Sequence, residues 1–215
     1  ADGPSEGGDC GTFVFGEARI KVSVCVAGAG TSLFSRFRHR LVEGVGCEDA
    51  LIISATNKGW NLIFRGCLLE EGVTATKMRS RLIDLLLNFE HSNTGVLAYC
   101  HAAAVSNGSH SLLMPGDSGV GKSTLTGYLV ANGYAYLGDD VIAIGDSADE
   151  ILPLPTCLSI KEGSWILLAP FYPTLLHTPQ ISIFGRTLRY IPPEGNYKTM
   201  KAALAPSAIV FPTYK

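Results

Sequence analysis

The stretch Pro115-Gly-Asp-Ser-Gly-Val-Gly-Lys-Ser-Thr124 decides the fold of this 215-residue chain. It fills the pattern G-x-x-x-x-G-K-[ST], in which glycines let consecutive backbone N–H groups turn inward around a phosphate. The lysine of the pattern adds a positive charge, and its hydroxyl residue can hold Mg²⁺. We expect the phosphates of ATP or GTP to be bound by Gly116, Asp117, Ser118, Gly119, Val120, Gly121, Lys122, Ser123 and Thr124.

The sequence on either side of this stretch supports a phosphate-binding loop. Residues 110–114 predict a short buried strand, and residues 123–132 predict a helix that Gly133 ends. The loop then leads into a helix N-terminus, where backbone N–H groups and the helix dipole favour anions. The alternative is a glycine-rich turn that carries Lys-Ser by chance. The order of strand, loop and helix favours an α/β nucleotide-binding domain.

Two adjacent carboxylates, Asp139 and Asp140, interrupt the apolar, strand-like residues 134–144. Burying a charge is costly unless it is paired or binds a metal. On a strand the two side chains would point to opposite faces, so we expect one to position an attacking hydroxyl and the other to join a metal network. The alternative is a turn at the end of a strand, in which Gly138 and the two aspartates form a bend.

The spacing of these residues resembles a known enzyme family. Asp139 and Asp140 follow Lys122 by 17 and 18 residues, and His101 precedes it by 21 residues. Together with the loop at residues 116–123, this arrangement resembles the catalytic domain of the HPr kinase/phosphorylase family, bacterial enzymes that phosphorylate a serine of a carrier protein. The resemblance covers residues 101–160, about a quarter of the chain.

The resemblance implies a P-loop domain of the HPr kinase/phosphoenolpyruvate carboxykinase type. It implies that Asp139 is the general base, and that Asp140 belongs to the metal and phosphate network with Ser123 on Mg²⁺. It also implies that Lys122 holds the transferred phosphoryl group and that His101 lies against Asp139 and tunes its proton affinity. ATP and Mg²⁺ are the implied cofactors.

His101 has a second interpretation that rests on the residues alone. Asn107-Gly108 separates residues 100–106 from residues 110–114, and Asn-Gly between two apolar runs predicts a β-hairpin. His101 is then equally well explained as a core or hairpin residue. The two interpretations agree in placing His101 near the loop.

One stretch departs from the family. The family's further acidic metal ligand lies in a Leu-Glu-x-Arg motif, whereas the corresponding residues here are Leu158-Ser159-Ile160-Lys161. This difference suggests a divergent relative rather than an HPr kinase proper. Such relatives include kinases that phosphorylate the C-terminal serine of lasso-peptide precursors. The resemblance therefore predicts a peptide or small protein with an acceptor serine as partner, and a homo-oligomer.

Composition limits the classes of partner. Hydrophobic residues make up 47% and charged residues 17% of the chain, which is ordinary for a folded α/β protein. The net charge of −2 predicts no general attraction to nucleic acid. A local basic cluster lies in residues 36–40, and we interpret it as a solvated helix face. Arg186 and Arg189 are interpreted as surface strand arginines, with the alternative that one of them neutralises a γ-phosphate.

Cysteines and apolar segments indicate a cytoplasmic protein. The six cysteines are scattered without a C-x-x-C pair, which is typical of reduced thiols. The longest apolar stretch, residues 165–176, is too short for a membrane span and is broken by Pro170 and Pro173. We therefore expect no membrane association.

The chain is predicted to have three parts. Residues 1–11 are glycine-rich and acidic, and we expect a flexible tail. Residues 12–94 are expected to form a small N-terminal α+β subdomain, with strands and a helix over residues 76–89. Residues 95–215 are expected to form the kinase domain, whose C-terminal end we suspect to be truncated.

These observations predict an ATP-using, Mg²⁺-dependent kinase that phosphorylates a serine hydroxyl of a peptide or protein. Two alternatives remain open. One is a P-loop ATPase or GTPase that uses hydrolysis for conformational switching. The other is a nucleotide-binding regulator that has lost catalysis, which Ser159 in place of a metal-binding glutamate makes plausible.

Overall fold

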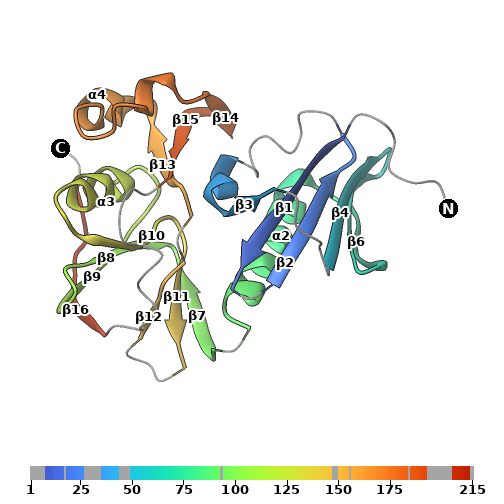
Figure 1. Ribbon diagram of the computed structural model, residues 1–215, viewed down its shortest axis with the longest axis horizontal. Helices are drawn as coiled ribbons and strands as arrows, with labels where there is room; N and C mark the ends of the chain where they lie inside the picture. Colours follow the sequence, from blue (N-terminus) through green and yellow to red (C-terminus); the bar gives the residue numbers. More distant parts are fainter. Residues whose placement is uncertain are drawn as a thin grey trace. The chain divides into compact units, whose positions relative to one another are not determined.

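The computed structural model of the chain is a mixed α/β fold with several sheets and few helices (Figure 1). The chain divides into two compact units, Ala1–Asn93 and Thr94–Lys215. The expected α/β class is therefore confirmed. The structure describes residues 8–16, 18–26, 35–43, 49–92, 94–146, 150–154, 156–183, 185–192 and 205–213.

The described part of the first unit is a six-stranded sheet in the order β3-β1-β2-β4-β5-β6. Strands β2 and β4 are parallel, and every other neighbouring pair is antiparallel. Strand β1 begins at Asp9, so residues 9–11, expected in the tail, pair with β2. The strands are β1 (Asp9–Phe15), β2 (Ala18–Val24), β3 (Leu41–Val42), β4 (Asp49–Thr56), β5 (Gly59–Phe64) and β6 (Cys67–Val73).

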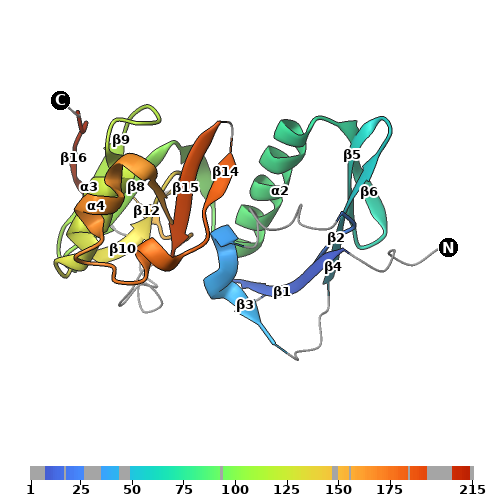
Figure 2. The same cartoon turned by 90° about the horizontal axis from the view of Figure 1, so that it is seen from above.

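Helix α2 (Ala75–Glu90) covers one face of this sheet (Figure 2). It begins where the Thr74 hydroxyl accepts a hydrogen bond from the N–H of Lys77, an N-cap that satisfies one free donor of the first turn. Leu82 and Leu86 of the helix are buried against apolar side chains of the sheet. The helix predicted over residues 76–89 is confirmed, and its apolar stripe forms the core of the unit.

The basic cluster of the first unit is not a solvated helix face. Arg36 is buried, and Arg40 lies just after it in the short 3-10 helix η1 (Arg38–Arg40). The Arg40 guanidinium donates to both carboxylate oxygens of Glu90, at 2.6 and 3.0 Å. The prediction is wrong because the end of α2 supplies a carboxylate from far along the sequence.

The second unit contains three sheets within its described residues. Their orders are β10-β8-β9-β16, β12-β11-β7 and β13-β15-β14. The strands are β7 (Val96–Cys100), β8 (Ala102–Ser106), β9 (Ser111–Pro115), β10 (Ala135–Gly138), β11 (Ile142–Gly145), β12 (Ile151–Leu152), β13 (Leu158–Lys161), β14 (Ile181–Ile183), β15 (Arg186–Ile191) and β16 (Pro206–Ile209). The helices are α3 (Lys122–Ala131), α4 (Trp165–Leu168), η2 (Glu162–Ser164) and η3 (Leu175–His177).

The hairpin of β8 and β9 carries the loop. Its register pairs Ser106 with Ser111, and all five residues of β8 are buried. The chain leaves β9, forms the glycine loop and enters α3, which contacts β8 and β10 (Figure 1). Gly133 follows α3 with a φ of +94°, the left-handed conformation that commonly ends a helix. The predicted hairpin, helix and helix end are confirmed.

Residues 134–144 do not form one continuous strand. Strand β10 pairs with β8, whereas β11 pairs with β7 in a different sheet. The break falls at Asp139, Asp140 and Val141. Just before the break, Gly138 lets the backbone of Leu154 pass close by, since a Cβ at residue 138 would lie 2.7 Å from Cδ1 of Ile142 and 3.0 Å from the carbonyl oxygen of Leu154. The bend alternative is correct for the backbone.

The chain therefore crosses between the same two sheets at two points. One crossing is at His101, between β7 and β8, and the other is at the two aspartates, between β10 and β11. The two crossings touch, because the Nδ1 atom of His101 lies 2.8 Å from the carbonyl oxygen of Asp140. The polar residues that the sequence predicted to be functional thus lie together where the chain passes from one sheet to the other.

Two further observations concern the chain outside the loop. Within the described residues, no helix is both long enough and apolar enough to cross a membrane. No disulfide joins the five cysteines that the structure describes, and Cys47 lies outside them.

Candidate functional site

The loop between β9 and α3 depends on the backbone freedom of its glycines. Gly116, Gly119 and Gly121 have φ values of +151°, +108° and +98°, which L side chains rarely adopt. A Cβ atom at Gly119 or Gly121 would meet no atom within 4 Å. The requirement for glycine at these two positions is therefore conformational, as expected for a loop that turns its N–H groups toward an anion.

Lys122 is the first residue of α3 and folds back into the loop. Its side chain is buried, and Nζ donates to the carbonyl oxygens of Gly116 at 2.6 Å and Asp117 at 2.9 Å. Nζ also lies 3.2 Å from Nε2 of His101. Since an ammonium group only donates, Nε2 accepts and the proton of a neutral His101 is on Nδ1. That assignment lets Nδ1 donate to Asp140.

Ser123 and Asp139 form the buried side of the site. The Ser123 hydroxyl donates to Oδ1 of Asp139 at 3.0 Å. Asp139 is only 1% exposed, and its Oδ2 accepts from the N–H of Ser159 at 3.4 Å. A side chain held by both α3 and β13 keeps a fixed position next to the first turn of the helix.

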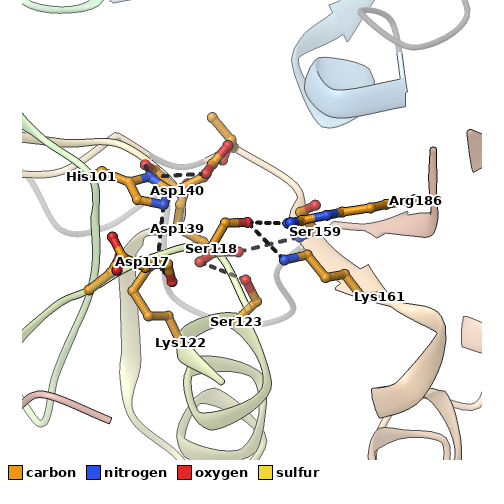
Figure 3. Close-up of polar contacts among 12 residues, drawn as sticks. His101, Asp117, Ser118, Lys122, Ser123, Asp139, Asp140, Ser159, Lys161 and Arg186 are labelled. Atoms are coloured by element: carbon orange, nitrogen blue, oxygen red, sulfur yellow. Dashed lines mark hydrogen bonds and ion pairs between the residues drawn. The ribbon is translucent and has the colours of Figure 1, made fainter. Parts of the chain in front are cut away.

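Asp140 faces the opposite way. Its φ is +76°, a left-handed conformation that is uncommon outside glycine, asparagine and aspartate. Its side chain is 40% exposed, and Oδ1 lies 3.3 Å from Nδ1 of His101 (Figure 3). The resemblance placed His101 against Asp139, but the hydrogen bonds of His101 go to Asp140 and Lys122, because the bend turns Asp140 toward it.

The remaining predicted loop residues have different surroundings. Asp117, Ser118 and Gly119 are exposed. The side chain of Val120 packs against Gly116, since a Cβ atom added to Gly116 would lie 3.1 Å from Cγ2 of Val120. The hydroxyl of Thr124 lies 2.6 Å from that of Ser164 in η2. Thr124 thus joins α3 to the segment after β13.

Lys161 and Arg186 reach the loop, although the sequence assigned Arg186 such a place only as an alternative and did not assign Lys161 to it. Nζ of Lys161 donates to Oγ of Ser118 at 2.9 Å, and Nη1 of Arg186 donates to the same oxygen at 2.6 Å. Lys161 ends β13 and Arg186 begins β15, and these strands pair with each other. Arg186 is an exposed strand arginine, as interpreted from the sequence, and it also contacts the loop, so the alternative of a role at the γ-phosphate stays open. The available signal for Lys161 was its position in the stretch Leu158–Lys161.

Arg189 belongs to the core of the unit and not to the loop. Its guanidinium lies 4.2 Å from the ring centroid of Trp165 and donates to the carbonyl oxygen of Leu175 at 2.7 Å. A buried arginine stacked on an aromatic ring stabilises packing through cation–π attraction. Arg189 therefore lies outside the loop, but its interpretation as a surface arginine is wrong, because the residue is only 8% exposed.

The oxygens of Ser123 and Asp139 fit Mg²⁺ in one particular way. Within the described part of the chain, no group of three or more His, Cys, Asp or Glu side chains could hold a metal ion. Enzymes that use nucleotides commonly bind Mg²⁺ through one or two protein oxygens, with water and substrate phosphates as the other ligands. The adjacent hydroxyl and carboxylate match this arrangement, whereas Asp140, expected in the metal network, lies at His101.

Burial and neighbouring charges both act on Lys161 beside the loop. The pKa of Lys161 is lowered first by burial and then by the charges of Arg186 and Lys122, while Asp140 and Asp139 act in the opposite sense.

No protein-family model and no curated protein matches the sequence. The site's own contacts therefore indicate its chemistry: a glycine loop, a lysine and a hydroxyl with a carboxylate can together bind a phosphate chain and a divalent cation.

Proposed function

We propose that this protein is a Mg²⁺-dependent kinase that transfers the γ-phosphoryl group of ATP to a serine hydroxyl of a peptide or small protein. One observation carries the proposal. The Ser123 hydroxyl, at the end of the glycine loop, donates a hydrogen bond to the buried carboxylate of Asp139, and the next residue, Asp140, has an exposed carboxylate that pairs with His101. The first pair suits a metal–nucleotide complex, and the second suits an acceptor that must lose a proton.

The nucleotide would lie on the loop and on the first turn of α3. Backbone N–H groups and Lys122 would bind the phosphates, while Ser123 and Asp139 would hold Mg²⁺. Mg²⁺, when bound, neutralises charge on the phosphate oxygens. The contact between Ser123 and Asp139 supports this assignment, because the two side chains already lie within 3.0 Å of each other.

The contacts favour Asp140, rather than Asp139, as the general base. Asp140 is accessible to an incoming hydroxyl, while Asp139 is buried. In the proposed reaction the serine oxygen attacks the γ-phosphorus, and the bond from that phosphorus to the β,γ-bridging oxygen breaks. ADP leaves with the bonding electron pair, and the serine proton passes to the Asp140 carboxylate, which His101 orients.

A transfer assay with γ-labelled ATP and Mg²⁺ tests the proposal. The acceptors are peptides that end in serine and small carrier proteins with an exposed serine. We expect Asp140→Asn to lower transfer by about 10²- to 10⁴-fold, the usual contribution of a general base, with nucleotide affinity unchanged. Asp139→Asn should instead weaken the Mg²⁺-dependent part of nucleotide binding. The two matched variants differ only in which carboxylate loses its charge.

The opposite outcome is equally specific. Phosphate released at one rate with or without acceptor, and unchanged by Asp140→Asn, would leave a hydrolase. If Asp139→Asn abolished transfer while Asp140→Asn did not, the base would be Asp139, as the family resemblance implies. The resemblance also favours a cytoplasmic location and a homo-oligomer, and light scattering of the purified protein would test the oligomeric state.

A second candidate is a nucleotide-binding regulator without catalysis. The observation that favours it is at Ser159, whose backbone N–H contacts Asp139 at the position where the family has an acidic ligand. A site with fewer metal ligands could bind nucleotide without activating it. Tight Mg²⁺–ATP binding with neither transfer nor hydrolysis would support this candidate.

A further inference from the structure

Two cationic side chains converge on one neutral oxygen of the loop. Lys161 and Arg186 both donate to Oγ of Ser118, at 2.9 and 2.6 Å. They come from different strands of one sheet, β13 and β15, and approach Ser118 together from the side away from His101 and Asp140 (Figure 3). Both lone pairs of the hydroxyl are therefore directed at positive charges.

Among the residues that the structure describes, neither Lys161 nor Arg186 forms an ion pair with an Asp or Glu side chain. In the first unit, by contrast, Lys77 and Arg81 both contact Glu70. Two like charges that share a neutral partner repel each other, and an anion between them would turn this repulsion into attraction. Burial is the first cause of the lowered pKa of Lys161, and the charges of Arg186 and Lys122 add to it while Asp140 and Asp139 oppose it.

The position of Ser118 indicates which anion fits. Ser118 belongs to the glycine loop. An anion that accepts hydrogen bonds from Lys161 and Arg186 in place of the Ser118 hydroxyl would therefore lie next to this loop. Lysine supplies a compact charge and arginine supplies a planar fork, and both are suited to the several oxygens of a terminal phosphate. Lys122 is already within the loop, where it contacts Gly116 and Asp117.

We infer that Lys161 and Arg186 bind the terminal phosphate of the bound triphosphate, with the Ser118 hydroxyl as their acceptor when that phosphate is absent. The inference rests on the proposed function and deepens it, because it makes these residues the part of the site that distinguishes ATP from ADP. The two side chains would also supply positive charge, from within the same chain, to the phosphoryl group that is transferred.

Calorimetric titration with ADP and with the β,γ-imido analogue of ATP, both with Mg²⁺, tests the inference. Lys161→Met and Arg186→Met remove the charges one at a time. The controls are Lys58→Met and Arg19→Met, which remove exposed charges from the first unit. Each site variant should weaken analogue binding by about 10- to 100-fold, as expected for a charged hydrogen bond, and should leave ADP binding unchanged. The controls should change neither.

A third ligand keeps the test decisive. Equal losses of ADP and analogue in the methionine variants would overturn the inference, and so would no loss of either. Inorganic phosphate is titrated into the ADP-bound protein. If the variants lost phosphate binding alone, the cations would serve a separate phosphate site, which also overturns it.

These titrations measure binding only, so they remain informative if no acceptor is found. Failure of transfer with intact analogue discrimination would reject the proposed function and keep Lys161 and Arg186 as γ-phosphate ligands. Phosphoryl transfer without discrimination between ADP and the analogue would support the proposed function and reject Lys161 and Arg186 as γ-phosphate ligands. Thermal melting of each variant, followed by circular dichroism, identifies any variant that is unfolded.

Discussion

Single residues divide the work of the site between two adjacent carboxylates. Asp139 is buried on Ser123 and Asp140 is exposed on His101, although one peptide bond joins them. The difference follows from the bend between β10 and β11 and from the left-handed φ of Asp140. Sequence reasoning predicted two roles from the alternation of a strand. The structure has the two different environments but reaches them through a turn.

Lys161 predicts a pH dependence at this same scale. Burial and the charges of Arg186 and Lys122 lower its pKa below the 10.5 of an ordinary lysine, while Asp139 and Asp140 oppose them. Lys161 should therefore lose its charge, and its attraction for a phosphate, as pH rises through a range below that value. Affinity for the imido analogue should fall in this alkaline range, as measured by titration at a series of pH values. Lys161→Met should remove the fall, and a fall that persisted would exclude Lys161 as its cause.

At the scale of elements, a carboxylate at the end of α2 holds the helix to the first sheet. Glu90 accepts from the Arg40 guanidinium and from the N–H of Gly16 at 2.8 Å. The side chains of Arg40 and Glu90 are only 11% and 15% exposed, so the interaction is partly shielded from water. This contact connects residues that are far apart in the sequence, and no local pattern predicts it.

Replacing Glu90 by Ala should lower the free energy of unfolding of the first unit by about 1.5–3 kcal/mol, the range for a charged hydrogen bond. The loss leaves Arg40 partly buried without this carboxylate. Urea unfolding measures it. Asp84→Ala is the matched control, because Asp84 is half-exposed and lies 3.9 Å from Arg81, so its loss should cost little. Equal effects of the two variants would contradict the prediction.

The sequence could predict those elements that depend on local signals. The hairpin at Asn107-Gly108, the glycine loop and the end of α3 at Gly133 rest on local signals, and the structure has all three. The meeting of Lys161 and Arg186 at the loop depends on how β13 pairs with β15. No short stretch of sequence specifies the pairing of distant strands, so the sequence assigned Arg186 a role at the γ-phosphate only as an alternative and did not assign Lys161 to the loop.

For the whole molecule, each unit has its own apolar core. In the first unit Phe13, Leu51 and Leu82 are buried together, and in the second unit Met114, Tyr136 and Leu158 are. A unit with a core of its own can keep its structure when the other is weakened. The glycine loop, its lysine and both aspartates all belong to the second unit.

Leu51→Ala should therefore separate stability from binding. Leu51 is fully buried in β4, so the substitution should lower the free energy of unfolding by about 2–5 kcal/mol. Below the unfolding transition, the dissociation constant for Mg²⁺–ADP should equal that of the unsubstituted protein. Urea unfolding and calorimetric titration measure the two quantities. A weaker nucleotide affinity in the folded variant would show that the first unit contributes to the site.

The two crossings between the sheets of the second unit have one more consequence. Asp139 follows β10 in one sheet and Asp140 precedes β11 in the other, while His101 joins β7 to β8 across the same boundary. The contact of His101 with the carbonyl oxygen of Asp140 therefore joins the two crossings at one point of the boundary. A slight sliding of one sheet along the other would break this contact, whereas the two aspartates would stay together because one peptide bond joins them.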